Sequence, residues 1–141
     1  MIVYLDINVV LDFLLGNRAF SLEVAQLLTL VRSKKITVYT APNAIIMGFA
    51  FLRKGPDKRS EKDVKHTLAL FRKLVHCVSV TEAEVDKALT LSSPKDLEDG
   101  FQVVLAQKCG ADVFITNDRK GFKGSPIKTI SSKQFLLEWE F

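Results

Sequence analysis

Short apolar runs rich in β-branched residues alternate along the chain with longer stretches whose apolar residues recur at helical spacing. The first run, residues 2–5, is almost entirely apolar, as is typical of a strand buried on both faces of a sheet. The expected strands are residues 2–5, 36–40, 77–80, 112–116 and 127–130. The expected helices are residues 8–15, 21–32, 42–53, 60–74, 81–91, 93–109 and 131–139. This alternation predicts a parallel sheet with helices on both faces.

Polar residues and prolines mark where several of these helices begin. Ser60 and Thr81 each open a pattern typical of a capping box. Ser93 followed by Pro94 predicts the start of the sixth helix, because proline suits the first helical turn.

The length and composition of the chain limit the classes of protein to which it can belong. With 141 residues, 48% of them hydrophobic and 26% charged, residues 1–141 are expected to form a single domain with its own core. This composition excludes an intrinsically disordered protein. The apolar runs are too short to span a membrane, which takes about 20 residues, and no secretory signal is visible. We therefore expect a cytoplasmic protein with no membrane association.

The net charge of +4 permits an anionic partner but does not require one. Basic residues form two groups: Arg53, Lys54, Lys58, Arg59 and Lys62, and then Arg119, Lys120 and Lys123. Each group could follow a phosphate backbone or form an ordinary solvated surface. No basic stretch is interleaved with aromatic residues, so the sequence does not predict a platform for stacking bases.

Four aspartates stand where a parallel sheet would bring them together. Asp6 follows the first strand and Asp118 follows the fourth. Ligands of open α/β sheets bind outside the carboxyl ends of the strands, so these two acids converge if the strands are neighbours. Asp96 and Asp99 lie one helical turn apart and project from one face of their helix. The four side chains could therefore form one pocket.

Carboxylates gathered in one pocket repel each other unless a cation neutralises them. Mg²⁺ prefers a few carboxylates with water and leaves positions for phosphate oxygens. A metal held in this way can activate water and stabilise charge on phosphorus. The arrangement thus indicates metal-dependent hydrolysis of phosphodiesters.

Each acid also has a simpler interpretation. Asp96 could cap its helix, and Asp118 could cap a turn. Asp6 is harder to explain in this way, because it sits at a buried sheet edge where an unpaired carboxylate is costly. Asp12 lies in the next helix but not on the same rim, so we expect it at the surface.

Three ordered segments resemble the motifs of PIN-domain proteins. Residues 4–12 (YLDINVVLD) resemble the opening motif, residues 96–106 (DLEDGFQVVLA) the central acidic helix, and residues 110–122 the closing strand and acidic turn. The resemblance implies a three-layer α/β/α sandwich with a central parallel sheet of four to five strands. It implies a ribonuclease dependent on Mg²⁺ or Mn²⁺ that acts on RNA. Many compact members are VapC-type toxins, which pair with an antitoxin and usually form homodimers.

The resemblance also assigns roles by motif position. Catalytic acids would be Asp6, Asp99 and Asp118, which with the accessory acid Asp96 would bind the metal. Asn8 and Asn117 would be polar residues of the cofactor-binding shell, beside Asp6 and Asp118.

One position departs from the family pattern. PIN domains commonly carry a further acid on the helix after the second strand, and Met47 stands where that glutamate is expected. The nearest polar residue, Asn43, sits one helical turn earlier. The departure supports an alternative function, that of a catalytically weakened PIN-like domain that binds RNA or protein. A third reading, a different Mg²⁺-dependent phosphotransfer enzyme, is disfavoured because Asn8 replaces the second acid of a DxD pair.

The helix over residues 42–53 is apolar around most of its circumference. A helix of this kind must be buried. Core packing alone could hide it, or one face could be covered by an antitoxin segment or by a second copy of this chain.

Overall fold

The structure is a computed structural model that describes residues 1–16, 21–55, 57–118 and 120–139. Its centre is a parallel sheet of five strands in the order β3-β2-β1-β4-β5. The strands are β1 (Ile2–Leu5), β2 (Thr37–Thr40), β3 (Val75–Cys77), β4 (Val113–Ile115) and β5 (Lys128–Ile130). The predicted parallel sheet is therefore confirmed.

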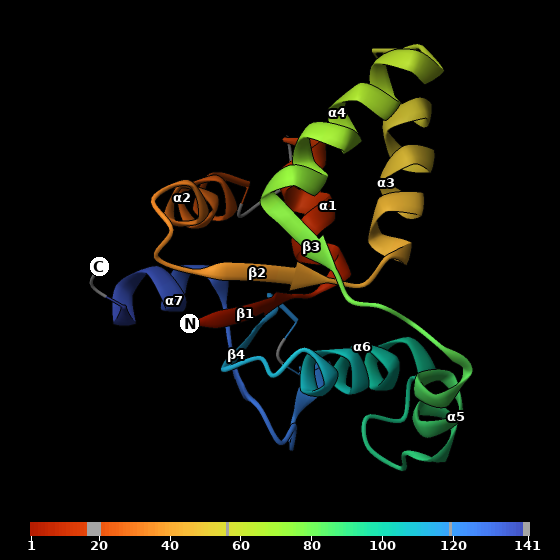
Figure 1. Cartoon of the computed structure of the whole chain (residues 1–141), viewed down its shortest axis with the longest axis vertical. Coiled ribbons are helices and arrows are strands. Elements are labelled where there is room, and N and C mark those ends of the chain that lie inside the picture. The colour runs from red at the N-terminus through yellow and green to blue at the C-terminus, as the bar shows by residue number, and fades with distance from the viewer. Residues whose placement is uncertain (17–20, 56, 119, 140–141) are drawn as a thin grey trace.

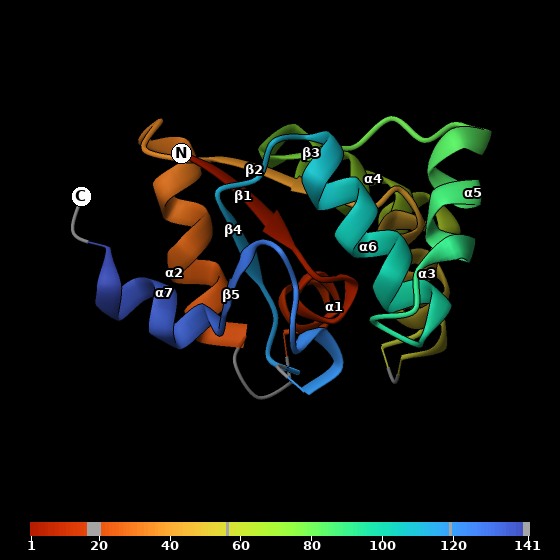
Figure 2. The ribbon, with the colours of Figure 1, turned by 90° about the horizontal axis from the view of Figure 1, so that it is seen from below.

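Helices cover both faces of this sheet. The helices are α1 (Ile7–Leu15), α2 (Ser21–Arg32), α3 (Asn43–Lys54), α4 (Glu61–Leu74), α5 (Glu82–Thr90), α6 (Leu97–Lys108) and α7 (Ser132–Glu138), with a short 3₁₀ helix η1 (Lys120–Phe122). Figures 1 and 2 show α1 and α2 on one side of the sheet and α6 on the other, so the three-layer α/β/α arrangement is also confirmed.

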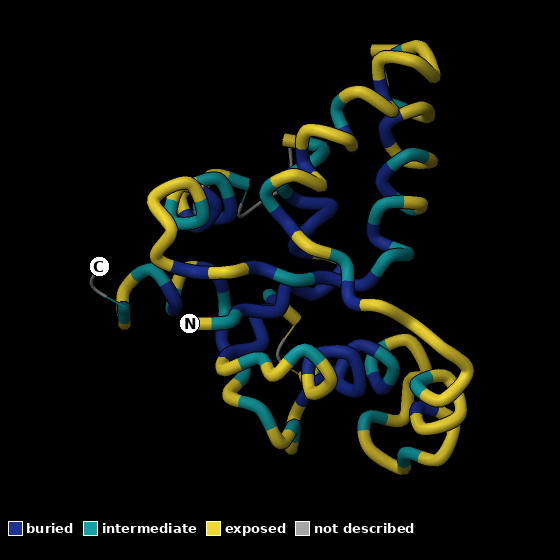
Figure 3. The backbone as a smooth tube through the Cα atoms, in the orientation of Figure 1, coloured by how far each residue is buried: buried dark blue, intermediate teal, exposed yellow. Residues whose placement is uncertain are grey.

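The central position of β1 explains its sequence. Val3 pairs in register with Val38 of β2 and with Val113 of β4, so both edges of β1 are hydrogen-bonded. Helices cover both faces, and Val3, Tyr4 and Leu5 are fully buried. In Figure 3 the buried residues follow the strands and the inner sides of α1 and α6.

Close packing between α1 and α3 depends on a glycine. A Cβ added at Gly48 would meet Leu14 Cδ1 at 2.8 Å and Leu68 Cδ2 at 3.3 Å. The missing side chain lets α3 approach α1 and α4 together. The α3–α4 pair then extends away from the sheet, as Figure 1 shows. One face of α3 is buried, but Ile46 on the other face is 71% exposed.

The third strand is shifted relative to the prediction for residues 77–80. It spans Val75–Cys77, because α4 ends at Leu74 and the chain passes directly into the sheet. The Val78 N–H still donates to Thr40 O at 3.0 Å, so sheet-like pairing continues for one residue beyond the strand.

The predicted start of the sixth helix at Ser93 is wrong. Helix α6 begins at Leu97, since Asp96 is its N-cap and accepts a hydrogen bond from the Asp99 N–H at 3.0 Å. A carboxylate at the cap satisfies a backbone donor that would otherwise lack an intrahelical partner.

The prediction of a surface position for Asp12 is also wrong. Asp12 is buried, with 8% of its surface exposed. Helix α1 packs against both α2 and α3, so the side of α1 expected to face solvent is covered. The Asp12 backbone carbonyl accepts hydrogen bonds from Ser21 Oγ at 2.6 Å and from the Gly16 N–H at 3.2 Å.

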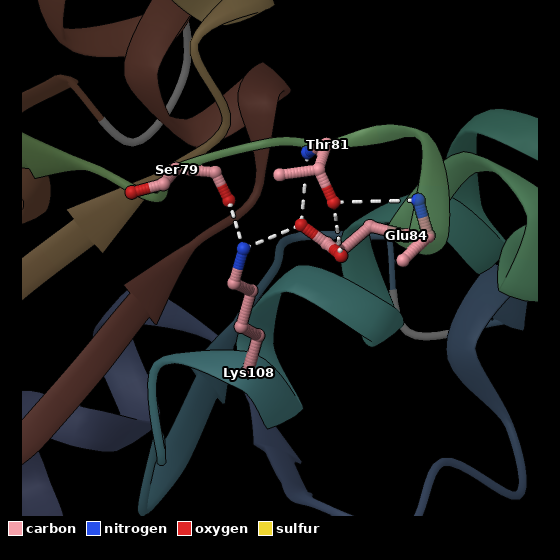
Figure 4. Close-up of polar contacts among 5 residues, drawn as sticks. Ser79, Thr81, Glu84 and Lys108 are labelled. Carbon is pink, nitrogen blue, oxygen red and sulfur yellow. Dashed lines mark hydrogen bonds and ion pairs between the residues drawn. The ribbon is translucent and has the colours of Figure 1, made fainter.

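A polar cluster joins the end of α6 to the start of α5 (Figure 4). Thr81 and Glu84 form the predicted capping box, with the Thr81 N–H donating to Glu84 Oε1 at 3.0 Å. The Lys108 ammonium donates to the same carboxylate and to Ser79 O, the latter at 2.7 Å. Hydrogen bonding from Lys108 is the main cause that lowers the pKa of Glu84 to about 2. This cluster fixes the segment before α5 against α6.

Among the described residues, no helix is both long and apolar enough to cross a membrane.

Candidate functional site

The predicted convergence of Asp6 and Asp118 requires that their strands be neighbours, and they are. Leu5 of β1 pairs in register with Ile115 of β4, and the Asp6 N–H donates to Ile115 O at 2.9 Å. Asp6 and Asp118 therefore follow adjacent strands at the carboxyl edge of the sheet. The start of α6, with Asp96 and Asp99, opens at the same edge.

Asp6 is held in one orientation by hydrogen bonds to both carboxylate oxygens. Oδ2 accepts from Thr116 Oγ1 at 2.7 Å. Oδ1 accepts from Gln102 Nε2 at 2.9 Å and from the Asn8 N–H at 3.4 Å, which makes Asp6 the N-cap of α1. The side chain is 2% exposed. Burial raises its pKa, while the hydrogen bonds from Thr116, Gln102 and Asn8 oppose that rise.

Gln102 is a site residue that sequence reasoning missed. Its amide nitrogen donates to Asp6, and its amide oxygen accepts from the Ile7 N–H at 2.9 Å and from Tyr4 Oη at 3.4 Å. The residue is fully buried in α6. The signal in the sequence was a glutamine on an otherwise apolar helix face, followed directly by Val103 and Val104. A buried amide needs partners, and here the partner is the candidate catalytic acid.

Asp99 lies in the first turn of α6, directly after the cap formed by Asp96. Partial burial raises the pKa of Asp99 to about 6, and repulsion from Asp96, Asp6 and Asp118 adds to the rise. These acids thus influence each other, as the prediction of one pocket requires. Asp96 serves as the helix cap, which is the simpler role that the sequence left open for it.

Gly121 in η1 lies against two of the acids. A Cβ placed on it would meet Asp99 Oδ2 at 3.0 Å and Asp118 Oδ2 at 3.5 Å. The two carboxylate oxygens therefore flank one small space, and a side chain at this position would occupy it. Sequence reasoning did not identify Gly121.

The two predicted polar shell residues lie differently. Asn8 contacts Asp6 through its backbone N–H, and the residue itself is exposed to solvent. Asn117 Oδ1 accepts from the Ser132 N–H at 3.3 Å and from Ser132 Oγ at 3.2 Å, which joins the end of β4 to the start of α7. The Asn117 Nδ2 atom is buried and has no hydrogen-bond partner among the described residues.

Met47, which stands where the family pattern has a glutamate, also has apolar surroundings in the structure. Met47 is half-buried and packs against the main hydrophobic core. One turn earlier, Asn43 begins α3, and its Oδ1 atom is buried without a hydrogen-bond partner in the described part of the chain.

The carboxylates at this edge of the sheet offer the type of ligand atom that a hard divalent cation binds. All are oxygen atoms, and Mg²⁺ or Mn²⁺ binds carboxylates and completes its coordination with water. One carboxylate oxygen of Asp99 and one of Asp118 lie within 3.5 Å of the position that a Cβ on Gly121 would take. Over residues 1–16, 21–55, 57–118 and 120–139, no three His, Cys, Asp or Glu side chains are close enough to share a metal ion. The residue types fit such an ion, and Asp99 and Asp118 are the two carboxylates that would hold it.

The second basic group lies beside this edge. Lys120 and Lys123 line a hollow of about 490 Å³ next to β5, together with Lys128, whose ammonium pairs with Glu138 at 2.8 Å. Arg119 lies outside the described residues. In the first group, the Arg59 guanidinium donates to Thr67 Oγ1.

Asp99→Asn is expected to stabilise the metal-free protein at neutral pH. The folded protein holds the Asp99 proton more tightly than the unfolded chain, so this carboxyl lowers stability as the pH rises from 3.8 to about 6. At neutral pH the variant's free energy of unfolding is expected to exceed that of wild type by on the order of 1 kcal/mol, after solvent screening is taken into account. This difference disappears near pH 4. Urea unfolding of wild type and variant across this range measures it. Asp86→Asn, on the exposed face of α5, is the control with the same charge change, and an equal gain in both variants would contradict the prediction.

Gln102→Leu is expected to destabilise the protein by about 1–3 kcal/mol for each buried polar group that it leaves without a partner. The Ile7 N–H and one oxygen of Asp6 both lose their Gln102 contacts. Urea unfolding compares this variant with Gln107→Leu, the same change at an exposed position of α6. Equal stability of the two variants would show that the Gln102 contacts do not hold the site.

Comparison with known proteins gives matches along most of the chain. A family model described as PIN domain matches residues 2–120. The chain is similar to Ribonuclease VapC1 of Aquifex aeolicus (strain VF5), with 28% identity over 97% of this chain and 94% of the relative.

Two solved structures share the fold. One is the crystal structure of VapBC2 from Rickettsia felis bound to a DNA fragment from their promoter, with a TM-score of 0.66, 17% identity, and coverage of 93% of this chain and 98% of the matched chain. The other is the structure of FitAB bound to an IR36 DNA fragment, with a TM-score of 0.61, 18% identity, and coverage of 92% and 94%. The ordered motifs, the five-stranded sheet and the family match agree, and the chain belongs to the PIN-domain family.

Proposed function

We propose that this protein is a metal-dependent ribonuclease that hydrolyses RNA phosphodiester bonds, and that it is the toxin of a toxin–antitoxin pair. The similarity to a protein named as a VapC ribonuclease supports this function. The observation that carries it is the pair of carboxylate oxygens of Asp99 and Asp118 around one small space at Gly121, with Asp6 fixed beside them. This arrangement favours the nuclease over the alternative of a weakened binding module.

The metal we propose is Mg²⁺ or Mn²⁺, held by Asp99 and Asp118 with Asp6 and Asp96 as the further acids of the site. When bound, such an ion supplies activation of water and neutralisation of charge on the phosphate. The protein supplies fixed ligands: Thr116 and Gln102 orient Asp6, and the α6 backbone orients Asp96. Asn8 and Asn117 complete the polar shell, the first through its backbone N–H.

The absence of the usual glutamate does not by itself remove this activity. Water can fill coordination positions of Mg²⁺, so the ion needs only one or two carboxylates from the protein. Lys120 stands next to Gly121 in η1 and lines the adjacent basic hollow. We propose that its ammonium attracts the RNA phosphate backbone.

Gly121→Ala is expected to reduce RNA cleavage by about 100-fold, since small displacements of reacting groups cost this much. The added methyl group would stand 3.0 Å from Asp99 Oδ2 without any change of charge. Cleavage of RNA in Mg²⁺ and in Mn²⁺ measures the effect, and calorimetric titration of each metal reports binding separately. Gly55→Ala is the control, because its new Cβ would make ordinary contacts at 3.5 Å. Cleavage by Gly121→Ala at the wild-type rate would refute the assignment of this space.

The α3–α4 pair offers a surface for the partner of a toxin. Between the two helices lies an open groove of about 450 Å³ with almost wholly apolar walls, formed by Ile45, Ile46, Phe49, Leu68 and Ala69, with Lys65 and Arg72 also lining it. We propose that an apolar segment of the antitoxin occupies this groove. The two solved structures that share the fold are of VapBC2 and FitAB, which supports a protein partner of this class.

We also propose a homodimer, a single domain over residues 1–141 and a cytoplasmic location. Strands from the beginning and the end of the chain share one sheet and one core, which supports a single domain. The cytoplasmic location agrees with an RNA substrate.

Ile46→Asp is expected to abolish capture of the proposed antitoxin, because it places a charge at the apolar groove. Co-purification of the tagged protein with the antitoxin measures capture, and light scattering of the protein alone measures the homodimer. Leu137→Asp is the control, since Leu137 on α7 is 74% exposed, like Ile46 at 71%. Undiminished capture by Ile46→Asp would place the antitoxin elsewhere.

A further inference from the structure

Tyr4 carries a hydroxyl group into the fully buried centre of the sheet. The residue lies on β1 two positions before Asp6, and none of its surface is exposed. Its ring stacks on Phe114 of β4, with the ring centroids 5.1 Å apart, and Phe114 packs against Phe122 of η1 at 4.5 Å. A phenylalanine at position 4 could make the same ring contacts. The hydroxyl group therefore needs a separate explanation, because a polar group is costly to bury unless it is hydrogen-bonded.

The partner of this hydroxyl group is Gln102. Tyr4 Oη donates to Gln102 Oε1 at 3.4 Å, and the Ile7 N–H donates to the same oxygen at 2.9 Å. A backbone N–H can only donate, so the end of the amide that it meets must be the oxygen. The other end, Nε2, then donates to Asp6 Oδ1 at 2.9 Å. Both donors on Oε1 thus act on Asp6, because they determine which end of the amide faces the carboxylate.

The hydrogen bonds of this network all run toward the Asp6 carboxylate. The Tyr4 hydroxyl donates to the Gln102 carbonyl, and the Gln102 amide donates to one oxygen of Asp6. On the other oxygen, Thr116 Oγ1 donates at 2.7 Å, while it accepts from the Asp118 N–H at 3.0 Å. Hydrogen bonds to an ionised group are among the stronger ones, and donors on both oxygens give the carboxylate one orientation. A reversed amide would instead place Gln102 Oε1 against Asp6 Oδ1, and two acceptors repel each other.

We propose that Tyr4 is a positioning residue, which acts through Gln102 to hold the Asp6 carboxylate in one orientation. The consequence for metal binding rests on the proposed metal-dependent function. Loss of a residue that orients a metal ligand typically lowers metal affinity by roughly 10–100-fold. Tyr4 acts through one intermediate residue and shares the Gln102 oxygen with the Ile7 N–H, so we expect an effect of about tenfold, at the lower end of this range.

Tyr4→Phe tests the proposal, because it removes the hydroxyl group and keeps the ring. Calorimetric titration of the full-length protein with Mn²⁺ is expected to give an affinity about tenfold lower than that of wild type. Tyr39→Phe in β2 is the control with the same change. The Tyr39 ring packs against His76, and its hydroxyl group forms no hydrogen bond within the described part of the chain. A loss of stability alone would leave the Mn²⁺ affinity of the folded protein unchanged.

A double-mutant cycle separates positioning from packing. The Gln102→Leu variant has no amide to orient, so adding Tyr4→Phe to it is expected to cause no further loss of Mn²⁺ affinity. A general effect of Tyr4 on the core would instead lower the affinity in both backgrounds.

NMR of the metal-free protein gives a second readout that needs neither Mn²⁺ nor the double variant. The signals of the Gln102 side-chain amide and of the Asp6 carboxylate carbon are expected to shift in Tyr4→Phe. They are expected to keep their wild-type positions in Tyr39→Phe.

The outcomes separate this inference from the proposed function. Unchanged Mn²⁺ affinity of Tyr4→Phe, an equal loss in the Gln102→Leu background, or unmoved Gln102 and Asp6 signals would overturn the positioning role. Wild-type protein that binds no Mn²⁺ and cleaves no RNA would remove the proposed function. In that case the signals of the metal-free protein would still decide whether Tyr4 orients the amide and, through it, the carboxylate.

Discussion

The buried carboxylate of Asp6 is the constraint on which the site depends. A charge at a sheet edge that is 2% exposed is costly, and the fold offsets this cost with donors from two distant segments. Thr116 comes from the end of β4, and Gln102 comes from the inner face of α6. The same hydrogen bonds that stabilise Asp6 therefore hold β1, β4 and α6 in one geometry, and the other acids are placed by those elements.

Much of this arrangement follows from the sequence. The apolar run at residues 2–5 predicted a central strand, and β1 is the middle strand of the sheet. Acids placed directly after strands predicted a pocket at the carboxyl edge, and the adjacency of β1 and β4 agrees with it. Periodicity and strand ends are local features, so one sequence is enough to read them.

The features that the sequence did not predict depend on contacts between residues that are far apart along the chain. Gln102 reads as one polar residue on an apolar helix until its partner 96 positions away is known. Gly121 has no side chain to attract attention, and its importance lies in the oxygens that surround it. Asp12 was misplaced because the packing of α2 and α3 against α1 could not be read from α1 alone.

The hydrogen bond between Thr116 and Asp6 joins residues 110 positions apart. During synthesis Asp6 leaves the ribosome early, while its partner and the strand that carries it are still to be made. Until β4 is added beside β1, the carboxylate has neither Thr116 to orient it nor Asp118 next to it. A nascent or prematurely ended chain that lacks β4 therefore cannot assemble the site, whatever the state of its first strand.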